Sequence, residues 1–197
     1  MRRALWFSVF NFLLFLLITA CGPAPDYDVI IRGGTIYDGS GGTPYAADLA
    51  VDGDAIVAIG DLDTLRGQIE IDATGMAVSP GFINMLSWAN NSLIQDGRSL
   101  SDIHQGVTLE IMGEGASMGP LNETMKQEKK DRQGDIKYDI TWTTLGQYLQ
   151  FLEDKGVSCN VASFIGGETI RIHEVGYEDH PPTAEELGRM KDLVHQA

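Results

Sequence analysis

Two acidic side chains that follow predicted strands are the residues of this sequence best placed to do chemistry. Glu114 comes directly after the β-branched run of residues 106–113, which ends in glycine, and Glu168 follows the apolar run of residues 157–165. A carboxylate at a strand end can ligate a hard or borderline cation. It can equally cap a helix or accept hydrogen bonds from loop amides. Glu114 is therefore the main candidate for a metal ligand and a catalytic residue.

Arg171 is the second catalytic candidate. Cys159 is not expected to be catalytic. The planar guanidinium of Arg171 can bind a substrate carboxylate through two parallel hydrogen bonds. An ion pair with Glu168 or Glu174 explains the arginine equally well. Cys159 lies in the apolar run of residues 157–161, which favours a buried structural thiol over a nucleophile.

Short apolar runs between turn residues predict a small β-domain over residues 27–79. The predicted strands are residues 28–32, 35–39, 47–51, 55–60, 69–72 and 76–78. An Asp-Gly pair, Asp52-Gly53, separates two of these runs and predicts a hairpin, because such turns need positive φ. About 50 residues is less than most independently stable domains contain.

Beyond Pro80 the pattern changes to alternating strands and helices. Helices are predicted over residues 92–104 and 144–155, and a third runs from the capping box at Thr183 to the end of the chain. Strands are predicted over residues 107–113 and 157–165, with a solvated loop or surface helix over residues 122–137. This order is typical of a parallel β/α architecture.

The first 26 residues predict an exported, lipid-anchored protein. Met1-Arg2-Arg3 is cationic, residues 4–18 are apolar, and the end at residues 18–21 resembles a bacterial lipobox. We therefore expect a lipoprotein signal over residues 1–21, lipidation of Cys21, and a tether over residues 22–26. The expected location is the bacterial cell envelope, on the periplasmic or outer-membrane side. An uncleaved apolar anchor with an incidental cysteine is the alternative.

The charge of the chain excludes one class of partner. The formal net charge is −14, and no dense basic cluster is present, so nucleic acid is not an expected partner. If Cys21 carries lipid, only Cys159 remains, and no intramolecular disulfide can form. The expected partners are a small-molecule amide and, through the anchor, a membrane.

Several motifs in order resemble the D-aminoacylase (N-acyl-D-amino-acid deacylase) branch of the amidohydrolase superfamily. They are residues 28–39, 78–83, 105–108, 156–163 and 181–187. The resemblance implies a β-sandwich attached to a (β/α)₈ barrel. We therefore expect part of the sandwich over residues 27–79 and an incomplete TIM-type barrel, about three β/α units, over residues 80–197. Three units do not close a barrel and the chain stops inside a helix, so we expect a fragment.

The resemblance also implies zinc at the strand ends, yet this chain lacks the expected ligands. Two family histidines at the end of the first barrel strand correspond to Leu86 and Trp88, and a family cysteine corresponds to Gly115. A Gly-His-Gly of the family is replaced by residues 166–168, Gly-Gly-Glu. Neither leucine nor an indole donates a lone pair to a cation. This chain alone is therefore predicted to be inactive.

The resemblance implies a hydrolase of carbon–nitrogen bonds other than peptide bonds, acting on N-acyl-D-amino acids. An active complete protein would use a metal set built differently, with Glu114 as one ligand. One alternative is a non-catalytic, lipid-anchored binding protein on the same scaffold. Another is hydrolysis of a cyclic amide.

Overall fold

The computed structural model describes residues 24–197, which divide into two compact units. The first ends at Pro80 and the second runs from Gly81 to Ala197. The predicted signal segment and the lipidation candidate Cys21 lie outside the described residues. Within residues 24–197, none of the helices combines the length and the apolar character needed to cross a membrane.

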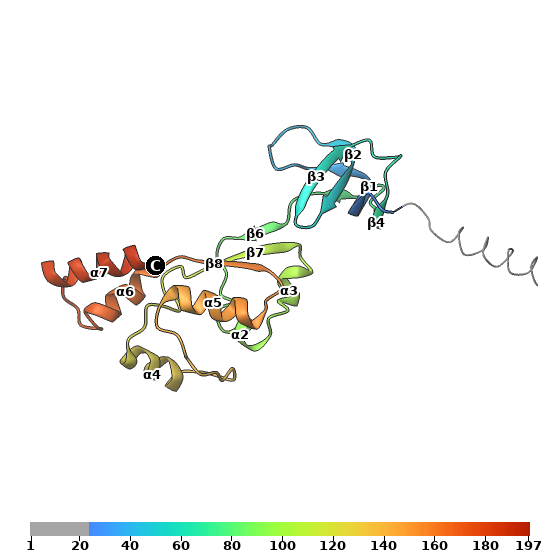
Figure 1. Cartoon of the computed structure of the whole chain (residues 1–197). Coiled ribbons are helices and arrows are strands. Elements are labelled where there is room, and N and C mark those ends of the chain that lie inside the picture. The colour runs from blue at the N-terminus through green and yellow to red at the C-terminus, as the bar shows by residue number, and fades with distance from the viewer. Residues whose placement is uncertain (1–23) are drawn as a thin grey trace, which may run out of the picture. The chain divides into compact units, whose positions relative to one another are not determined.

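The first unit is a five-stranded sheet (Figure 1). Its strands are β1 (Tyr27–Ile36), β2 (Tyr45–Asp52), β3 (Ala55–Gly60), β4 (Gly67–Asp72) and β5 (Ala77–Val78). The strand order is β3-β2-β1-β4, and β5 also pairs with β1. Strands β1, β2 and β3 form antiparallel pairs, whereas β4 and β5 run parallel to β1.

The predicted hairpin is confirmed between β2 and β3. Asp52 pairs with Ala55, and the turn between them contains Gly53 at φ 59°, a left-handed conformation that glycine adopts without steric cost. A register shift in β1 between Ile31 and Gly34 marks an irregularity in that strand.

The core of the first unit is small. Ile30, Ala50 and Leu62 are buried together. Apolar side chains elsewhere on the strands, among them Ile56 and Ile69, are 62% and 57% exposed. Within residues 24–80 the strands form a single sheet, so the second layer of the expected sandwich is not among the residues that the structure describes.

Arg32 connects three parts of the first unit. Its guanidinium donates to Asp48 on β2 at 3.1 Å and to Glu70 on β4 at 3.0 and 3.2 Å. It also donates to the carbonyl oxygens of Leu62 and Leu65 in the β3–β4 connection, at 2.8 and 2.7 Å. The bonds to Asp48 and to the two carbonyls are partly buried, whereas those to Glu70 are exposed to water.

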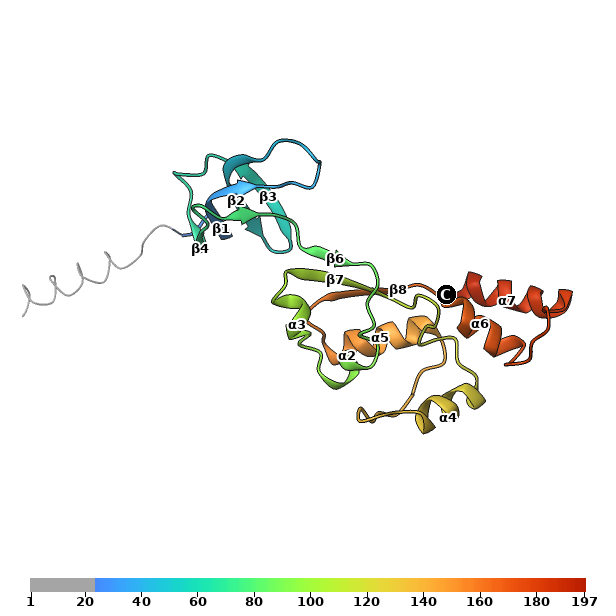
Figure 2. The same cartoon turned by 180° about the vertical axis from the view of Figure 1, so that it is seen from behind.

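The second unit contains a three-stranded parallel sheet, seen from behind in Figure 2. Its strands are β6 (Phe82–Asn84), β7 (Val107–Met112) and β8 (Asn160–Ser163), in the order β6-β7-β8. Leu109 of β7 pairs with Ile83 on one side and with Asn160 on the other. The predicted strand over residues 157–165 is thus shorter than expected.

Six helices of the second unit accompany this sheet. They are α2 (Ser92–Gln95), α3 (Leu100–Ile103), α4 (Glu123–Asp131), α5 (Leu145–Lys155), α6 (Gly167–Glu174) and α7 (Ala184–Gln196). The main core includes the wholly buried Tyr148 and Leu152 of α5 and Met112 of β7. Trp142 is 2% exposed, and its indole NH donates to the carbonyl of Met118 at 2.7 Å, which satisfies the polar atom of a buried ring.

Two predicted helices are confirmed with their caps. Thr144 and Gln147 form a capping box at the start of α5, and Gly156 ends that helix at φ 79°. Thr183 and Glu186 form the same box at the start of α7.

The single helix predicted over residues 92–104 is wrong, because two short helices occupy this range. Ser99 between them has φ 45°, and Gly97 approaches the carbonyl of Gly156 so closely that a Cβ would lie 2.5 Å from that oxygen. Helix α6 was not predicted. It begins at glycines, where local propensity gives little sign of a helix.

Replacing Arg32 tests the importance of its network. Arg32→Met should lower the free energy of unfolding of the first unit by about 2 kcal/mol, because it removes the hydrogen bonds to Asp48, Glu70 and two carbonyls, although Asp48 keeps the amide of Gly33 as a donor. Hydrogen exchange of the β1 and β2 amides measures this unit alone and should become faster. Arg66→Met, an exposed change in the same unit, is the control. Equal exchange in the two variants would contradict the prediction.

Candidate functional site

The three parallel strands end at one edge of the sheet, which we call the strand-end edge. It comprises residues 85–88 after β6, residues 113–116 after β7 and residues 164–168 after β8. Ligands of parallel β/α folds bind beyond the carboxyl ends of the strands. The structure therefore brings the segments of Leu86, Trp88, Glu114, Gly115 and Glu168 to one edge, while Arg171 lies further along α6.

Leu86 and Trp88 point outward from a buried serine. Their exposed fractions are 52% and 71%, whereas Ser87 between them is 6% exposed. The amide of Ser87 donates to the carbonyl of Ile111 at 2.8 Å, so this segment continues along β7 after β6 ends. The edge thus presents an aliphatic side chain and an indole, and neither can bind a metal ion.

Glu114 is exposed in the loop after β7. Within residues 24–197 its carboxylate has no hydrogen-bond or ion-pair partner, so it does not cap a described helix. Gly115 beside it has φ 73°, and its carbonyl accepts from the amide of Glu168 at 3.0 Å. The loops are tightly packed there, since a Cβ on Gly166 would lie 2.4 Å from the Gly115 oxygen.

Arg171 is engaged by the loop between α6 and α7. It donates to the carbonyls of Glu178 and His180 at 2.5 and 3.0 Å. The alternative ion pairs with Glu168 or Glu174 do not form in the described part of the chain. Glu174 instead accepts from Arg189 at 2.5 Å. Arg171 thus orders a loop, and Glu168 at the start of α6 is exposed.

The residues of the strand-end edge do not fit a zinc ion. Structural and catalytic zinc sites use at least three protein ligands from histidine, cysteine or acidic residues. Among residues 24–197, no three such side chains are grouped closely enough to hold a metal. Leu86, Trp88 and Gly115 supply no donor side chain, which leaves Glu114 and Glu168 as separate, exposed carboxylates.

A buried carboxylate lies beside the edge, and sequence reasoning missed it. Glu110 of β7 is wholly buried. Three hydroxyl or thiol groups donate to it: Ser87 at 2.5 Å, Ser99 at 2.6 Å and Cys159 at 3.0 Å. These donors come from the segments after β6, before α3 and before β8. One carboxylate therefore joins three segments to the central strand.

Burial and hydrogen bonding act in opposite directions on this group. Burial raises the pKa of Glu110, but the bonds from Ser87, Ser99 and Cys159 together outweigh it and leave the pKa below the ordinary value of 4.5. Burial and the neighbouring carboxylate raise the pKa of Cys159 to about 11. The cysteine is thus a protonated donor at neutral pH, and its predicted burial is confirmed.

The signal that could have identified Glu110 is its position in the strand. Buried residues of β7 alternate, and Glu110 has the same phase as the buried Met112. A glutamate at a core position requires hydrogen-bond donors, because an unpaired buried charge is unfavourable.

Glu110→Gln should lower the free energy of unfolding by about 3 kcal/mol, because an amide NH₂ would face groups that all donate. Equilibrium denaturation at pH 7 with a fluorescence readout measures this loss. Glu114→Gln removes an equivalent charge from an exposed loop and is the matched control. Equal stability of the two variants would refute the assigned role.

The same carboxylate predicts an acid dependence. Because folding lowers the pKa of Glu110, its contribution to stability is complete above the ordinary value of 4.5 and is lost as pH falls through the lower folded pKa. Wild type should therefore lose more stability than Glu110→Gln between neutral and acidic pH. Parallel pH titrations of the unfolding midpoint provide this comparison.

Comparison with known proteins gives consistent sequence relatives. The chain is 32% identical to "D-aminoacylase" of Alcaligenes xylosoxydans xylosoxydans over 175 residues, 87% of this chain and 35% of that protein. It is 32% identical to "N-acyl-D-aspartate deacylase" of the same organism over 86% of this chain and 34% of that protein. The chain thus spans about a third of the length of these relatives. No protein-family model matches it.

Solved structures match over a similar share of the chain. The crystal structure of D-aminoacylase, described as defining a subset of amidohydrolases, superposes with a TM-score of 0.72 at 31% identity, covering 85% of this chain and 35% of that one. N-acyl-D-glutamate deacylase from Bordetella bronchiseptica, solved with zinc and a phosphonate inhibitor, gives a TM-score of 0.73 at 26% identity, covering 87% and 36%. A further structure concerns the binuclear metal centre of D-aminoacylase.

Proposed function

We propose, from the premise that this chain is a homologue of the D-aminoacylases in the amidohydrolase family over most of its length, that it forms one wall of a site for N-acyl amino acids. The strand-end edge is that wall. The observation that carries this proposal is the match of the described chain to deacylase structures, combined with the position of Leu86 and Trp88 at the edge.

The proposed architecture is the beginning of a TIM-type barrel with part of a β-sandwich before it. The parallel order β6-β7-β8 with helices between the strands supports the barrel. The exposed Ile56 and Ile69 of the first sheet support a missing second layer. The chain spans about a third of its relatives, which agrees with three β/α units.

The proposed reaction is hydrolysis of a carbon–nitrogen bond other than a peptide bond in a small-molecule amide. The names of the relatives and the phosphonate mimic of a tetrahedral intermediate in one of them support this class of reaction. Within residues 24–197, no three histidine, cysteine or acidic side chains are grouped closely enough to hold a metal ion. The groups that activate water are therefore proposed to lie elsewhere in a complete protein. Glu114 is proposed to contribute one carboxylate ligand from the strand-end edge.

One observation favours binding without catalysis as the second candidate. Leu86 and Trp88 replace donor side chains with 52% and 71% exposed apolar ones. Such a surface suits the acyl chain of an N-acyl amino acid better than it suits an ion. A binding protein on the same scaffold would keep this surface and need no metal.

Metal content and turnover test the proposal on the purified chain. We expect no stoichiometric zinc by elemental analysis and no amino acid released from N-acetyl-D-amino acids. One zinc ion bound per chain, and lost in Glu114→Gln, would contradict the conclusion that residues 24–197 lack a metal site.

Ligand binding tests the wall itself. N-acyl amino acids should change the fluorescence of the chain, and Trp88→Phe should remove most of this change, because Trp142, the other tryptophan of residues 24–197, is buried; Trp6 is replaced by phenylalanine in both proteins. Ile56→Ala removes an exposed apolar group from the first unit and is the control. An unchanged fluorescence response in Trp88→Phe would exclude Trp88 from the site.

The lipid anchor is a separate proposal on residues outside the structure. The lipobox pattern before Cys21 supports it. Cys21→Ser should move the protein from the membrane fraction to the soluble fraction and abolish labelling by a fatty-acid analogue. Cys159→Ser keeps a donor for Glu110 and should leave both the membrane fractionation and the fatty-acid labelling unchanged. Fatty-acid labelling that persists in Cys21→Ser would reject the anchor.

A further inference from the structure

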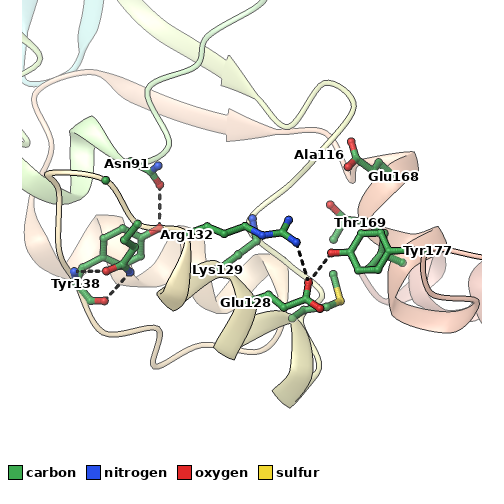
Figure 3. A pocket seen from close by; sticks show the side chains of 13 residues that line it. Asn91, Ala116, Glu128, Lys129, Arg132, Tyr138, Glu168, Thr169 and Tyr177 are labelled. Atoms are coloured by element: carbon green, nitrogen blue, oxygen red, sulfur yellow. Dashed lines mark hydrogen bonds and ion pairs between the residues drawn. The ribbon is translucent and has the colours of Figure 1, made fainter.

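A cavity lies beside α4, and we call it the α4 pocket. Its volume is about 280 Å³. Asn91, Ala116 and Thr169, which line it, follow β6, β7 and β8 respectively. All three strands thus lead to this pocket at their carboxyl ends, where parallel β/α folds bind ligands. Helix α4 closes the pocket from the other side (Figure 3).

Lys129 of α4 brings a positive charge to this pocket. Its side chain is half-buried, and in residues 24–197 its ammonium has no hydrogen-bond acceptor and no ion-pair partner. The other lysines of α4 differ, because Lys126 pairs with Glu123 at 2.9 Å and Lys130 with Asp139 at 3.0 Å. A partly buried cation without a protein partner can serve as the counter-ion of an anionic ligand.

The acidic residues of the pocket do not form an ion pair with Lys129. Glu128 accepts from the hydroxyl of Tyr177 at 2.5 Å and lies 4.0 Å from the guanidinium of Arg132. Glu168 is exposed and not within ion-pair distance of Lys129, although its charge opposes part of the fall in the lysine pKa. Loss of water around Lys129 is the larger effect and lowers that pKa.

A second donor faces the same space. Asn91 accepts the hydroxyl of Tyr138 at 2.9 Å through its carbonyl oxygen, which leaves its amide NH₂ without an acceptor in the described chain. Figure 3 shows Lys129 between the Asn91–Tyr138 pair and α6. The buried Met125 and half-buried Ile172 supply apolar wall. Two donors and an apolar wall suit a carboxylate that carries a short carbon chain.

We propose that the α4 pocket binds a small organic carboxylate, with the Lys129 ammonium as its counter-ion and the Asn91 amide as its second donor. The volume is slightly below the range of about 300–1,000 Å³ found for drug-sized ligands, which agrees with a molecule of a few carbon atoms. This pocket borders the strand-end edge and shares Ala116 and Glu168 with it, but its proposed ligand contacts are Lys129 and Asn91, not Leu86 and Trp88. The test of the α4 pocket measures propionate binding and not turnover. Either proposal can therefore fail while the other stands.

Titration calorimetry with sodium propionate on the full chain is the first test. Propionate should bind wild type, and Lys129→Gln should weaken binding about tenfold or more, because a charge-assisted hydrogen bond is lost. Lys155→Gln removes an exposed lysine at the end of α5 and should bind as wild type does. Propionate binding that is absent in wild type, or unchanged in Lys129→Gln, overturns the proposal.

The second test observes the lysine directly and does not depend on the folding of Lys129→Gln. Reductive ¹³C-methylation labels lysine amines for NMR, and Lys129→Arg identifies the Lys129 signal while keeping the charge. Propionate should shift this signal and raise the pKa measured for it, whereas Lys155 should not respond. Sodium phosphate is the competing probe. A response to phosphate without one to propionate overturns the carboxylate assignment.

Discussion

The buried carboxylate of Glu110 is the constraint on which the second unit depends. A wholly buried glutamate is tolerated only when donors replace the water that it has lost, and here Ser87, Ser99 and Cys159 provide them. Because the three donors come from different segments, satisfying one charge fixes the positions of all of them. Ser99 accepts a left-handed backbone conformation, φ 45°, while making its bond.

This constraint also determines what the strand-end edge can present. Ser87 is turned inward to reach Glu110, and its neighbours Leu86 and Trp88 are exposed. The segment after β6 therefore exposes an aliphatic side chain and an indole at the strand-end edge. β6 ends at Asn84, and the turn that follows leaves Leu86 and Trp88 exposed on either side of the inward serine, an arrangement that does not require them to bind metal. Fold and function are thus separable at this edge.

The sequence was sufficient where local rules determine the structure. The β2–β3 hairpin and the capped starts of α5 and α7 follow from turn glycines and from Thr144 and Thr183. Prediction was poorer where tertiary contacts determine the local backbone conformation. The close approach of Gly97 to another backbone broke an expected helix, and α6 formed from a glycine-rich start. The donors of Glu110 are 11 to 49 residues away from it, so no local pattern reveals the network.

The same loops face two chemically different environments, and this difference bears on function. At the strand-end edge they expose Leu86, Trp88 and a free carboxylate, Glu114, so that surface favours an apolar group and does not attract an anion. On the side of α4, the segments after the three strands meet Lys129, whose charge has no partner in residues 24–197. For an amide that carries both an acyl chain and a carboxylate, the strand-end edge suits only the acyl chain and the α4 pocket suits only the carboxylate. The two proposed sites therefore differ in chemistry, since one presents apolar side chains and the other a positive charge.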